Sequence, residues 1–273
     1  MTPTETQLVS GLGVSSAKNI HHQWLMDTLN AVKANAYIEG ADACYADLTH
    51  PQRLSNTCQI FREAYKVTGT ERSVDTAAFS DRYAYEATKA LKELKNDMEY
   101  ALMRGSIACG DATNAARQLR GIKSSLSLIT SDSGVSLTET ILNDYLQNVW
   151  AEGTEVNALY GGMYMKRKIS GYTAGATKNV DIKDRRLVLA VDIYEADAAK
   201  LVKLFAHRYV TVSGDTNYDL VGLNEDLFKI AYLRKPFTQV LAKTGDADKG
   251  EVLCEMTLEN LHYNAGFWAA QQI

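Results

Sequence analysis

Histidine and cysteine are the side chains that most often carry catalysis or bind metals, and this chain holds five and four of them. His21 and His22 are adjacent, and a metal site could begin with them and take Cys44 or Cys58 as further ligands. Adjacent residues of a helix point about 100° apart, however, and no H-E-x-x-H or C-x-x-C spacing fixes the remaining ligands. We therefore expect no metal site, with one histidine packed or capping a segment and the other facing water.

The cysteines stand at positions 44, 58, 109 and 254, with no repeated short spacing. The first seven residues lack the basic patch and apolar core of a secretory signal, and a chain of this length does not need disulfides for stability. We therefore expect all four thiols to be reduced. Cys254 lies in an alternating segment, which favours a small, buried, apolar role.

Signals for catalysis or nucleotide binding are weak. Residues 11–18 resemble a phosphate loop, but they lack the second glycine before the lysine and the Ser/Thr after it, so a flexible segment is favoured. No G-x-S-x-G motif or compact nucleophile pattern occurs. The basic run 166–168 is short, which favours a solvated turn or subunit contact over a nucleic-acid groove. The sequence thus predicts no enzyme and no cofactor.

The composition is that of an ordinary folded domain or pair of domains. The 273 residues are 46% hydrophobic and 23% charged, and the net charge of −4 leaves no overall basic footprint for nucleic acid. No apolar run is long enough to span a bilayer, so no membrane contact is expected. Only three prolines occur, which indicates long regular elements.

The amino-terminal third predicts an arm followed by mixed elements. Residues 1–20 are polar and aperiodic, and the apolar spacing over 22–39 is compatible with a helix. Residues 47–56 contain Pro51 and predict a loop, whereas 57–68 have strand character.

The clearest helix covers residues 81–104. Ser80 is suited to the N-cap, and Arg104 and Gly105 are suited to the end of a helix of about 36 Å. Lys95 and Glu99 predict an i,i+4 pair on the wet side. The predicted buried stripe consists of Ala84, Ala87, Leu91, Leu94, Met98 and Ala101.

The remaining chain predicts a second helix and several strands. Ser136 and Glu139 form a capping box for a helix that ends near Gly153. Strands are expected over 187–194, 201–212 (although 198–206 could form a short helix), 228–233, 237–241 and 252–259. The last has an acidic outer face made of Glu251, Glu255 and Glu259. This order predicts an α+β protein rather than a doubly wound sheet.

Several segments, taken in order, resemble the major head (major capsid) proteins of a group of tailed bacteriophages. The matching segments cover 22–29, 37–42, 56–61, 67–70, 93–99, 116–122 and 243–246. Their consistent order over most of the chain is more specific than any single short motif.

This resemblance implies the Hong Kong 97-like capsid fold, with an amino-terminal arm, an extended β-hairpin loop, a peripheral domain with a long spine helix, and an axial domain. We expect the arm at 1–39, the loop at 40–80 and the spine helix with peripheral domain at 81–125. Residues 126–245 would be mainly axial domain, and 246–273 would return to the peripheral domain. Phe79-Ser80-Asp81 and Ala198-Ala199 depart from the glycines typical of the family, and no residue here matches a lysine–asparagine crosslink.

The resemblance further implies a structural role in a virion capsid assembled in the host cytoplasm. Copies would form hexamers and pentamers that enclose double-stranded DNA without sequence-specific binding, with scaffold, protease, portal or decoration proteins as possible partners. Two alternatives are an encapsulin-like cellular shell and, more remotely, a metal-dependent hydrolase. Loop residues that could contact a neighbouring copy, or a partner within the same chain, are Arg53, Phe61, Arg62, Glu63, Tyr65 and Arg72.

Overall fold

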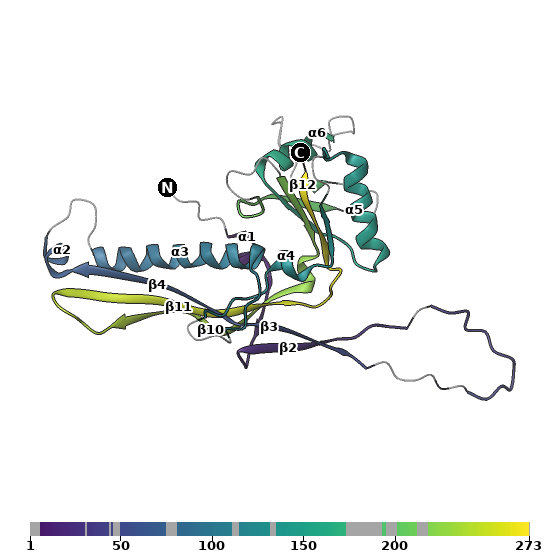
Figure 1. Cartoon of the computed structure of the whole chain (residues 1–273), viewed down its shortest axis with the longest axis horizontal. Coiled ribbons are helices and arrows are strands. Elements are labelled where there is room, and N and C mark those ends of the chain that lie inside the picture. The colour runs from purple at the N-terminus through teal and green to yellow at the C-terminus, as the bar shows by residue number, and fades with distance from the viewer. Residues whose placement is uncertain are drawn as a thin grey trace, which may run out of the picture.

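The computed structural model describes residues 6–30, 32–43, 45, 50–74, 81–110, 115–131, 135–172, 193–194, 201–211 and 218–272. The chain forms an elongated unit, in which a long helix lies along a twisted sheet, and a second unit built around another sheet (Figure 1). A thin excursion leaves the elongated unit on the side away from the long helix's N-terminus (Figure 1). The architecture is α+β, as the element order predicts.

The elongated unit contains a four-stranded sheet in the order β1-β10-β11-β4. Its central strands are β10 (Phe228–Leu241) and β11 (Ala247–Asn260), which pair antiparallel, and β4 (Gln59–Thr68) pairs antiparallel with the other side of β11. The sequence predicts two strands over 228–233 and 237–241. They form one strand, because irregularities in register on either side of Arg234 accommodate Pro236 without ending the pairing.

Helix α3 (Arg82–Arg104) confirms the predicted helix and packs on β4 and β11. Its N-cap is Asp81 rather than Ser80, because the Asp81 side chain accepts hydrogen bonds from the amides of Tyr83 and Ala84. Leu94, Met98 and Ala101 are buried as predicted, whereas Ala84 is exposed. Ala90 is the first fully buried residue of the helix.

The amino-terminal arm is more ordered than its polar composition predicts. Helix α1 (Gln7–Gly11) is followed by β1 (Gly13–Ser16), which pairs in parallel with β10 from Gly13 opposite Lys229. Leu8 is fully buried and Leu12 nearly so. These two apolar side chains fix a segment whose remaining residues are mostly polar.

Residues 22–39 are not a helix. Strand β2 (His21–Met26) pairs antiparallel with β3 (Gln52–Thr57), so the predicted loop over 47–56 also contains a strand. Burial along β2 alternates between exposed and half-buried positions, as expected of a two-stranded ribbon with one covered face. The pairing partner lies about 30 positions away, where local periodicity carries no information.

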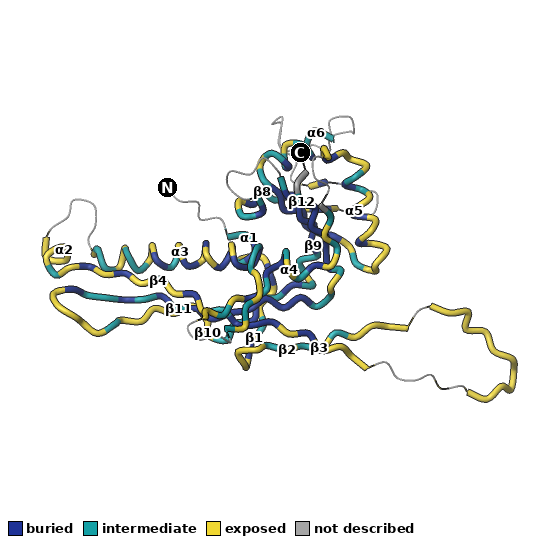
Figure 2. The backbone as a smooth tube through the Cα atoms, in the orientation of Figure 1, coloured by how far each residue is buried: buried dark blue, intermediate teal, exposed yellow. Residues whose placement is uncertain are grey.

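The excursion between β2 and β3 spans residues 27–51, and its described residues are exposed (Figure 2). The sequence places the extended loop at 40–80, but residues 59–68 form β4 inside the four-stranded sheet. Helix α2 (Gly69–Ser73) then follows β4 at the far end of the elongated unit. The excursion of the structure therefore overlaps the predicted loop of 40–80 only in part.

The second unit holds a six-stranded sheet in the order β5-β12-β9-β6-β8-β7. Its strands are β5 (Leu128–Ser131), β6 (Ala158–Gly161), β7 (Ile193–Tyr194), β8 (Val202–Ala206), β9 (Tyr218–Leu223) and β12 (Gly266–Gln272). Residues 246–273 are thus divided: β11 lies in the first sheet, and β12, which follows after a five-residue connection, lies in the second. Most of the predicted strand at 187–194 lies outside the described residues.

Helices complete both units. Helix α5 (Glu139–Ala151) confirms the second predicted helix, but its N-cap is Thr138, whose hydroxyl accepts from the amide of Ile141, instead of the predicted Ser136. The other helices of the described residues are the short α4 (Ile122–Ser125) and η1 (Glu225–Leu227) and the longer α6 (Met163–Tyr172). One hydrophobic core runs from α3 across the junction to Trp268 on β12 and so joins the two sheets.

Candidate functional site: an arm junction and exposed assembly surfaces

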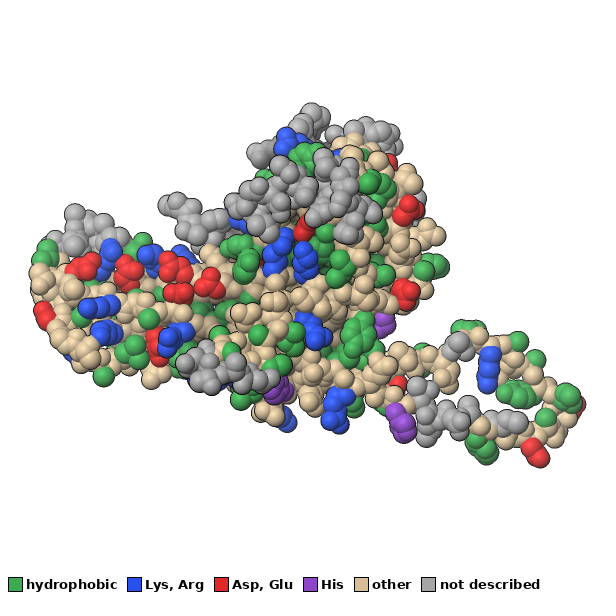
Figure 3. Space-filling model, in the orientation of Figure 1, with side chains coloured by type: hydrophobic (Ala, Val, Ile, Leu, Met, Phe, Trp, Pro, Cys, Tyr) green, Lys and Arg blue, Asp and Glu red, His purple; other side chains and the backbone are tan. Residues whose placement is uncertain are grey.

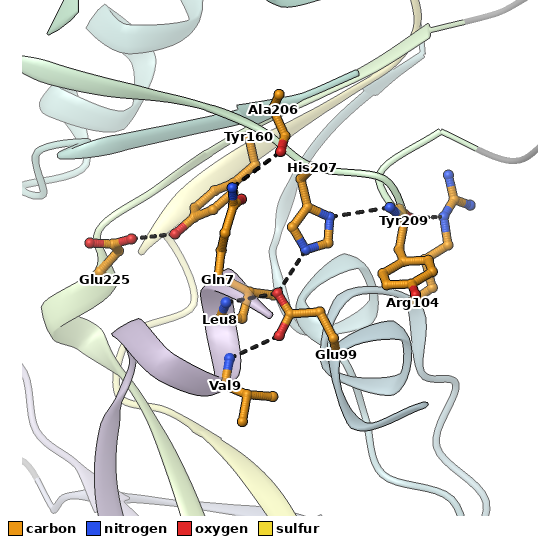
Figure 4. A network of polar contacts seen from close by, with 10 residues as sticks. All are labelled: Gln7, Leu8, Val9, Glu99, Arg104, Tyr160, Ala206, His207, Tyr209 and Glu225. Carbon is orange, nitrogen blue, oxygen red and sulfur yellow. Dashed lines mark hydrogen bonds and ion pairs between the residues drawn. The ribbon is translucent and has the colours of Figure 1, made fainter. Parts of the chain in front are cut away.

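A buried carboxylate lies where the arm, α3 and the six-stranded unit meet. Glu99 of α3 is fully buried, and its two oxygens accept hydrogen bonds from the amides of Leu8 (2.7 Å) and Val9 (2.9 Å) (Figure 4). His207, just after β8, lies 2.9 Å from the same carboxylate through Nε2. The predicted pairing of Glu99 with Lys95 on the wet side is therefore wrong, because α1 covers this face of the helix.

Glu99 acts as a cap for α1 that is supplied from 90 residues away. The first amides of a helix have no hydrogen-bond partner within the helix. A carboxylate accepts from two of them, and its negative charge is attracted to the partial positive charge at this end of the helix. A buried carboxylate is costly unless it is fully hydrogen bonded, and these three donors offset that cost. The arm is thus held by a specific polar contact as well as by Leu8.

The tautomer of His207 follows from its neighbours. Its Nδ1 accepts a hydrogen bond from the amide of Tyr209 (3.3 Å), so in the neutral ring Nε2 carries the proton and donates it to Glu99. Gln7 Nε2 donates to the carbonyl of Ala206 (3.2 Å), next to His207. The arm therefore contacts both α3 and the strand that leads into His207 (Figure 4).

A second polar group ties the end of α3 to the six-stranded sheet. Arg104 Nε donates to the carbonyl of Tyr209 (2.8 Å), and its Nη2 lies 3.1 Å from Asp219 Oδ2. Trp268 Nε1 donates to the same Asp219 oxygen (3.2 Å). Because β9 carries Asp219 and β12 carries Trp268, one carboxylate fixes two strands of the six-stranded sheet to the helix.

The acids of β11 do not form an outer face. Glu255 is buried and receives Arg117 Nη2 and Arg234 Nε, each at 3.0 Å. Glu259 is also buried and pairs with His22 of β2. The period-2 pattern identifies the alternation correctly, but it cannot show that distant cations and the β2–β3 ribbon cover these positions.

His21 and His22 lie on β2 and contact β3 and β11, respectively. His21 Nδ1 lies 3.4 Å from Thr57 Oγ1, and His22 contacts Glu259. Within the described residues, no group of three or more His, Cys, Asp or Glu side chains is placed to hold a metal ion.

The described cysteines are free thiols. Burial raises the pKa of Cys58 to about 11 and that of Cys254 to about 12, which keeps both protonated at neutral pH. The buried position of Cys254 confirms the sequence prediction. Cys109 is exposed, and Cys44 lies outside the described residues.

Two of the predicted contact residues are internal. Phe61 and Tyr65 on β4 belong to the core under α3, and the rings of Tyr65 and Tyr83 lie 5.1 Å apart. Burial raises the pKa of Tyr65 to about 12. Both side chains therefore have partners within their own chain, which is the alternative that the sequence left open.

The remaining predicted contacts are scattered. Glu63 faces Asp97 of α3, and burial, followed by the charge of Asp97 and a hydrogen bond with it, raises the pKa of the Glu63 carboxyl. Arg72 forms an ion pair with Asp248 of β11, and Arg62 is exposed on β4.

Arg53 lies apart from these residues, at the end of the ribbon where the excursion begins, opposite Leu25. It is exposed on β3 and lines a hollow of about 240 Å³ together with Trp24, Arg120 and Tyr263, among others. The six predicted contact residues therefore do not form one site.

The surface that sequence reasoning missed is the loop between β2 and β3. Leu29, Ile38 and Tyr45 expose 99%, 84% and 94% of their surfaces, and Val32 and Tyr37 are also largely exposed. Figure 3 shows such hydrophobic side chains along the excursion, clear of the rest of the molecule, whereas acidic and basic side chains alternate along α3. The sequence pattern that could have identified this exposed loop is the set of apolar residues on either side of Gly40, but their spacing also suits a helix.

Within the described residues, no helix combines the length and apolarity needed to cross a bilayer. The polar groups at the junction are each committed to holding one element against another. These hydrogen bonds and ion pairs hold the arm, the long helix and the two sheets together.

Comparison with solved structures places the fold among capsid shells. The capsid protein of a gene transfer agent (GTA) particle aligns over 100% of this chain and 92% of its own length, with a TM-score of 0.66 and 14% identity. The capsid of cyanophage A-1(L) aligns over 100% and 94%, with a TM-score of 0.66 and 12% identity. The encapsulin of Synechococcus elongatus PCC 7942 aligns over 99% and 88%, with a TM-score of 0.62 and 12% identity.

Sequence comparison agrees. The chain is 29% identical over 106 residues to the major capsid protein of Escherichia phage Phieco32, a match that spans 38% of this chain and 30% of that protein. A family model described as SU10 major capsid protein matches residues 1–271.

Proposed function

The chain belongs to the SU10 major capsid protein family and has the Hong Kong 97-like capsid fold; on this premise, we propose that many copies assemble into the icosahedral head that encloses the double-stranded DNA of a tailed bacteriophage. The role is structural. Hexamers and pentamers of this chain would build the shell, and the protein would reside in the virion after assembly in the host cytoplasm.

The observation that carries this proposal is the exposed loop of residues 27–45. An excursion with five large apolar side chains in water is unfavourable for an isolated chain, and such surfaces mark sites of protein association. Burial of a side chain of this size contributes about 1.5–3 kcal/mol. We propose that a neighbouring copy covers the loop and that this contact supplies much of the assembly energy.

The six predicted contact residues fall into two groups, those that are exposed and those that already have a partner within the chain. Arg53 and Arg62 are exposed and available for ion pairs with another copy. Arg53 lies at the end of the ribbon where the excursion begins, and Arg62 lies on the edge strand β4. Such pairs would fix register more than affinity. Phe61, Glu63, Tyr65 and Arg72 already have partners within the chain, and we assign them to its stability.

Further partners would act on the assembled shell or during its assembly. A scaffold, a maturation protease, a portal and decoration proteins are the classes expected for such a head, and no enzymatic activity or cofactor is proposed for this chain. The enclosed DNA would be held without sequence-specific contacts.

Electron microscopy of the purified full-length chain tests the proposal. We expect shells, rings or tubes at high protein concentration, with or without a scaffold. A strictly monomeric protein under all such conditions would overturn it. Particles that enclose a protein cargo instead of DNA after expression in the host would favour the encapsulin-like alternative.

A further inference from the structure

A small polar hollow lies where the β2–β3 ribbon meets β11, the connection after it and the segment that leads into α4. Its volume is about 240 Å³, and its lining includes Trp24, Arg53, Ser55, Arg120 and Tyr263. Each lining residue has at least three described residues on either side of it in the chain. We call this space the ribbon hollow.

The frame of the ribbon hollow is fixed by hydrogen bonds between distant segments. Asn56 is buried, and its Nδ2 donates to the carbonyls of Arg120 (3.0 Å) and Leu258 (2.8 Å). Trp24 Nε1 donates to the carbonyl of Asn260 (2.9 Å). These bonds hold the ribbon against β11, so the groups that border the hollow are positioned before anything binds there.

The groups left over in the ribbon hollow are hydrogen-bond donors. Arg53 is exposed and Arg120 half-buried, and neither guanidinium has an ion-pair or hydrogen-bond partner within the described residues. The hydroxyls of Ser55 and Tyr263 also have no partner there, and the lining includes no aspartate or glutamate. Asp27, at this end of the ribbon, accepts from the amide that follows it (2.9 Å). Guanidinium groups match the two oxygens of a carboxylate, so this set is suited to one.

The excursion carries most of the negative charge of the chain. Residues 27–51 contain four carboxylates and one lysine, so they contribute −3 to the net charge of −4. Glu39 is the midpoint of this segment and lies in a turn, where the amide of Ala41 donates to the carbonyl of Ile38 (3.1 Å) and Gly40 has a φ of +81°. A glycine with positive φ at the third position of a turn leaves the residue before it at the apex. The excursion therefore presents the exposed Glu39 carboxylate at its tip.

We propose that the Glu39 carboxylate of one copy docks in the ribbon hollow of a neighbouring copy, against Arg53 and Arg120. The inference rests on the proposed function and names the surface that receives the excursion. In a ring of identical copies, a head-to-tail contact joins two different patches of the same chain. The ribbon hollow lies where the excursion leaves the molecule, and the tip lies at the excursion's far end (Figure 1). Each copy would thus place its tip at the start of the next copy's excursion.

Apolar side chains beside Glu39 complete the match. Tyr37 and Ile38 are exposed on the same tip, and the hollow offers the rings of Trp24 and Tyr263. The apolar contacts would supply affinity, whereas the ion pair would fix where on the neighbour the tip lies.

A charge swap in the full-length chain tests the pairing. Arg53→Glu and Glu39→Arg should each raise the protein concentration needed for shells in electron micrographs at least about tenfold, and the double variant should restore assembly. Both positions are exposed, so thermal unfolding of the unassembled subunit should not change. Lys92→Glu, at an exposed position of α3, is the matched control and should assemble as wild type does. Normal assembly of both single variants, or a double variant that stays defective, would overturn the pairing.

Disulfide trapping separates this inference from the capsid proposal. Glu39→Cys combined with Arg53→Cys, in a chain that also carries Cys44→Ser and Cys109→Ser, should give a ladder of covalent multimers on a non-reducing gel after oxidation with diamide. Replacing Arg53→Cys by Lys92→Cys should remove the ladder. Shells without a ladder would overturn the docking site and leave the capsid proposal intact. A ladder from a protein that never forms shells would support the docking site and count against the capsid proposal.

Discussion

Strand β4 and the loop of residues 27–45 carry similar apolar side chains but differ in what covers them. On β4, Phe61, Tyr65 and Val67 point under α3 and are buried within the chain. On the loop, Leu29 and Ile38 are covered by no other part of the described chain (Figure 2). Apolar content therefore does not separate residues that are buried within the subunit from those that we propose a neighbouring copy covers. The position of the nearest covering element separates them.

The largest effect is expected where the chain covers itself. Leu94→Asp would place an unpaired carboxylate in the core beneath α3, where Leu94 is 1% exposed. We expect a loss of about 3–5 kcal/mol, which is a large part of the roughly 5–15 kcal/mol that stabilises a typical domain and is enough to unfold a marginally stable one. Circular dichroism and the yield of soluble protein measure it, and a folded, assembly-competent Leu94→Asp protein would contradict our placement of the buried stripe.

The matched change on the loop should affect assembly and not folding. Leu29→Asp, and the double variant with Ile38→Asp, should leave the thermal unfolding midpoint of the subunit within about 1–2 °C of wild type, because exposed positions contribute little to its stability. Shells should be lost in electron micrographs and in sedimentation. Normal assembly of the double variant would show that the loop is not an intersubunit contact.

A substitution at the arm junction should cause a loss of stability of intermediate size. Glu99→Gln keeps the shape but can accept through only one oxygen, so one arm amide or His207 loses its partner, at about 1–3 kcal/mol. We expect faster hydrogen exchange at the amides of Leu8 and Val9 and earlier proteolysis of the arm.

Glu93→Gln, on the exposed side of the same helix, serves as the control for Glu99→Gln. Equal protection of the arm amides in the two variants would refute the capping role of Glu99.

The smallest effect concerns Glu63, whose pKa is raised by burial and by Asp97. A raised carboxyl pKa in the folded state means that folding favours the protonated form. The contribution of the Glu63 carboxyl to the stability of the fold is fully present at acid pH and is lost as the pH rises through the raised pKa. Glu63→Gln should therefore raise the unfolding midpoint at pH 7 by the equivalent of a few tenths of a kcal/mol, and the gain should vanish at acid pH.

Glu155→Gln, at an exposed position, controls for net charge in this comparison. A gain from Glu63→Gln that grew toward acid pH would contradict the assigned cause.

Features set by nearby residues could be predicted from the sequence. Helix α3 was found within one residue because its periodicity, Arg104 and Gly105 all lie inside the segment itself. The family resemblance supplied the fold class, since it depends on ordered segments along most of the chain. The burial of Cys254 was predicted correctly because it shares an apolar face of β11 with Val252, Met256 and Leu258, and this face packs into the core.

Features set by distant partners could not be predicted. Strand β2 depends on β3, and the same apolar spacing suits a helix in isolation. Glu99 is indistinguishable from a surface acid until α1 is folded against it. The sequence could not show that residues 59–68 belong to a sheet, because β4 and the excursion both carry apolar residues and only the pairing with β11 decides which of them is internal.

The path of β11 has a mechanical consequence. The strand is hydrogen bonded on both sides, to β10 from Lys249 to Asn260 and to β4 from Ala247 to Met256, and its backbone continues within five residues into β12 of the other sheet. Tension between the two units is therefore carried by a covalent link along the strand direction. Because the ladder bonds lie across that direction, they are loaded in shear and must yield together instead of one after another. An outward pressure on the shell would thus meet a tie that resists extension, in addition to the hydrophobic junction beside it.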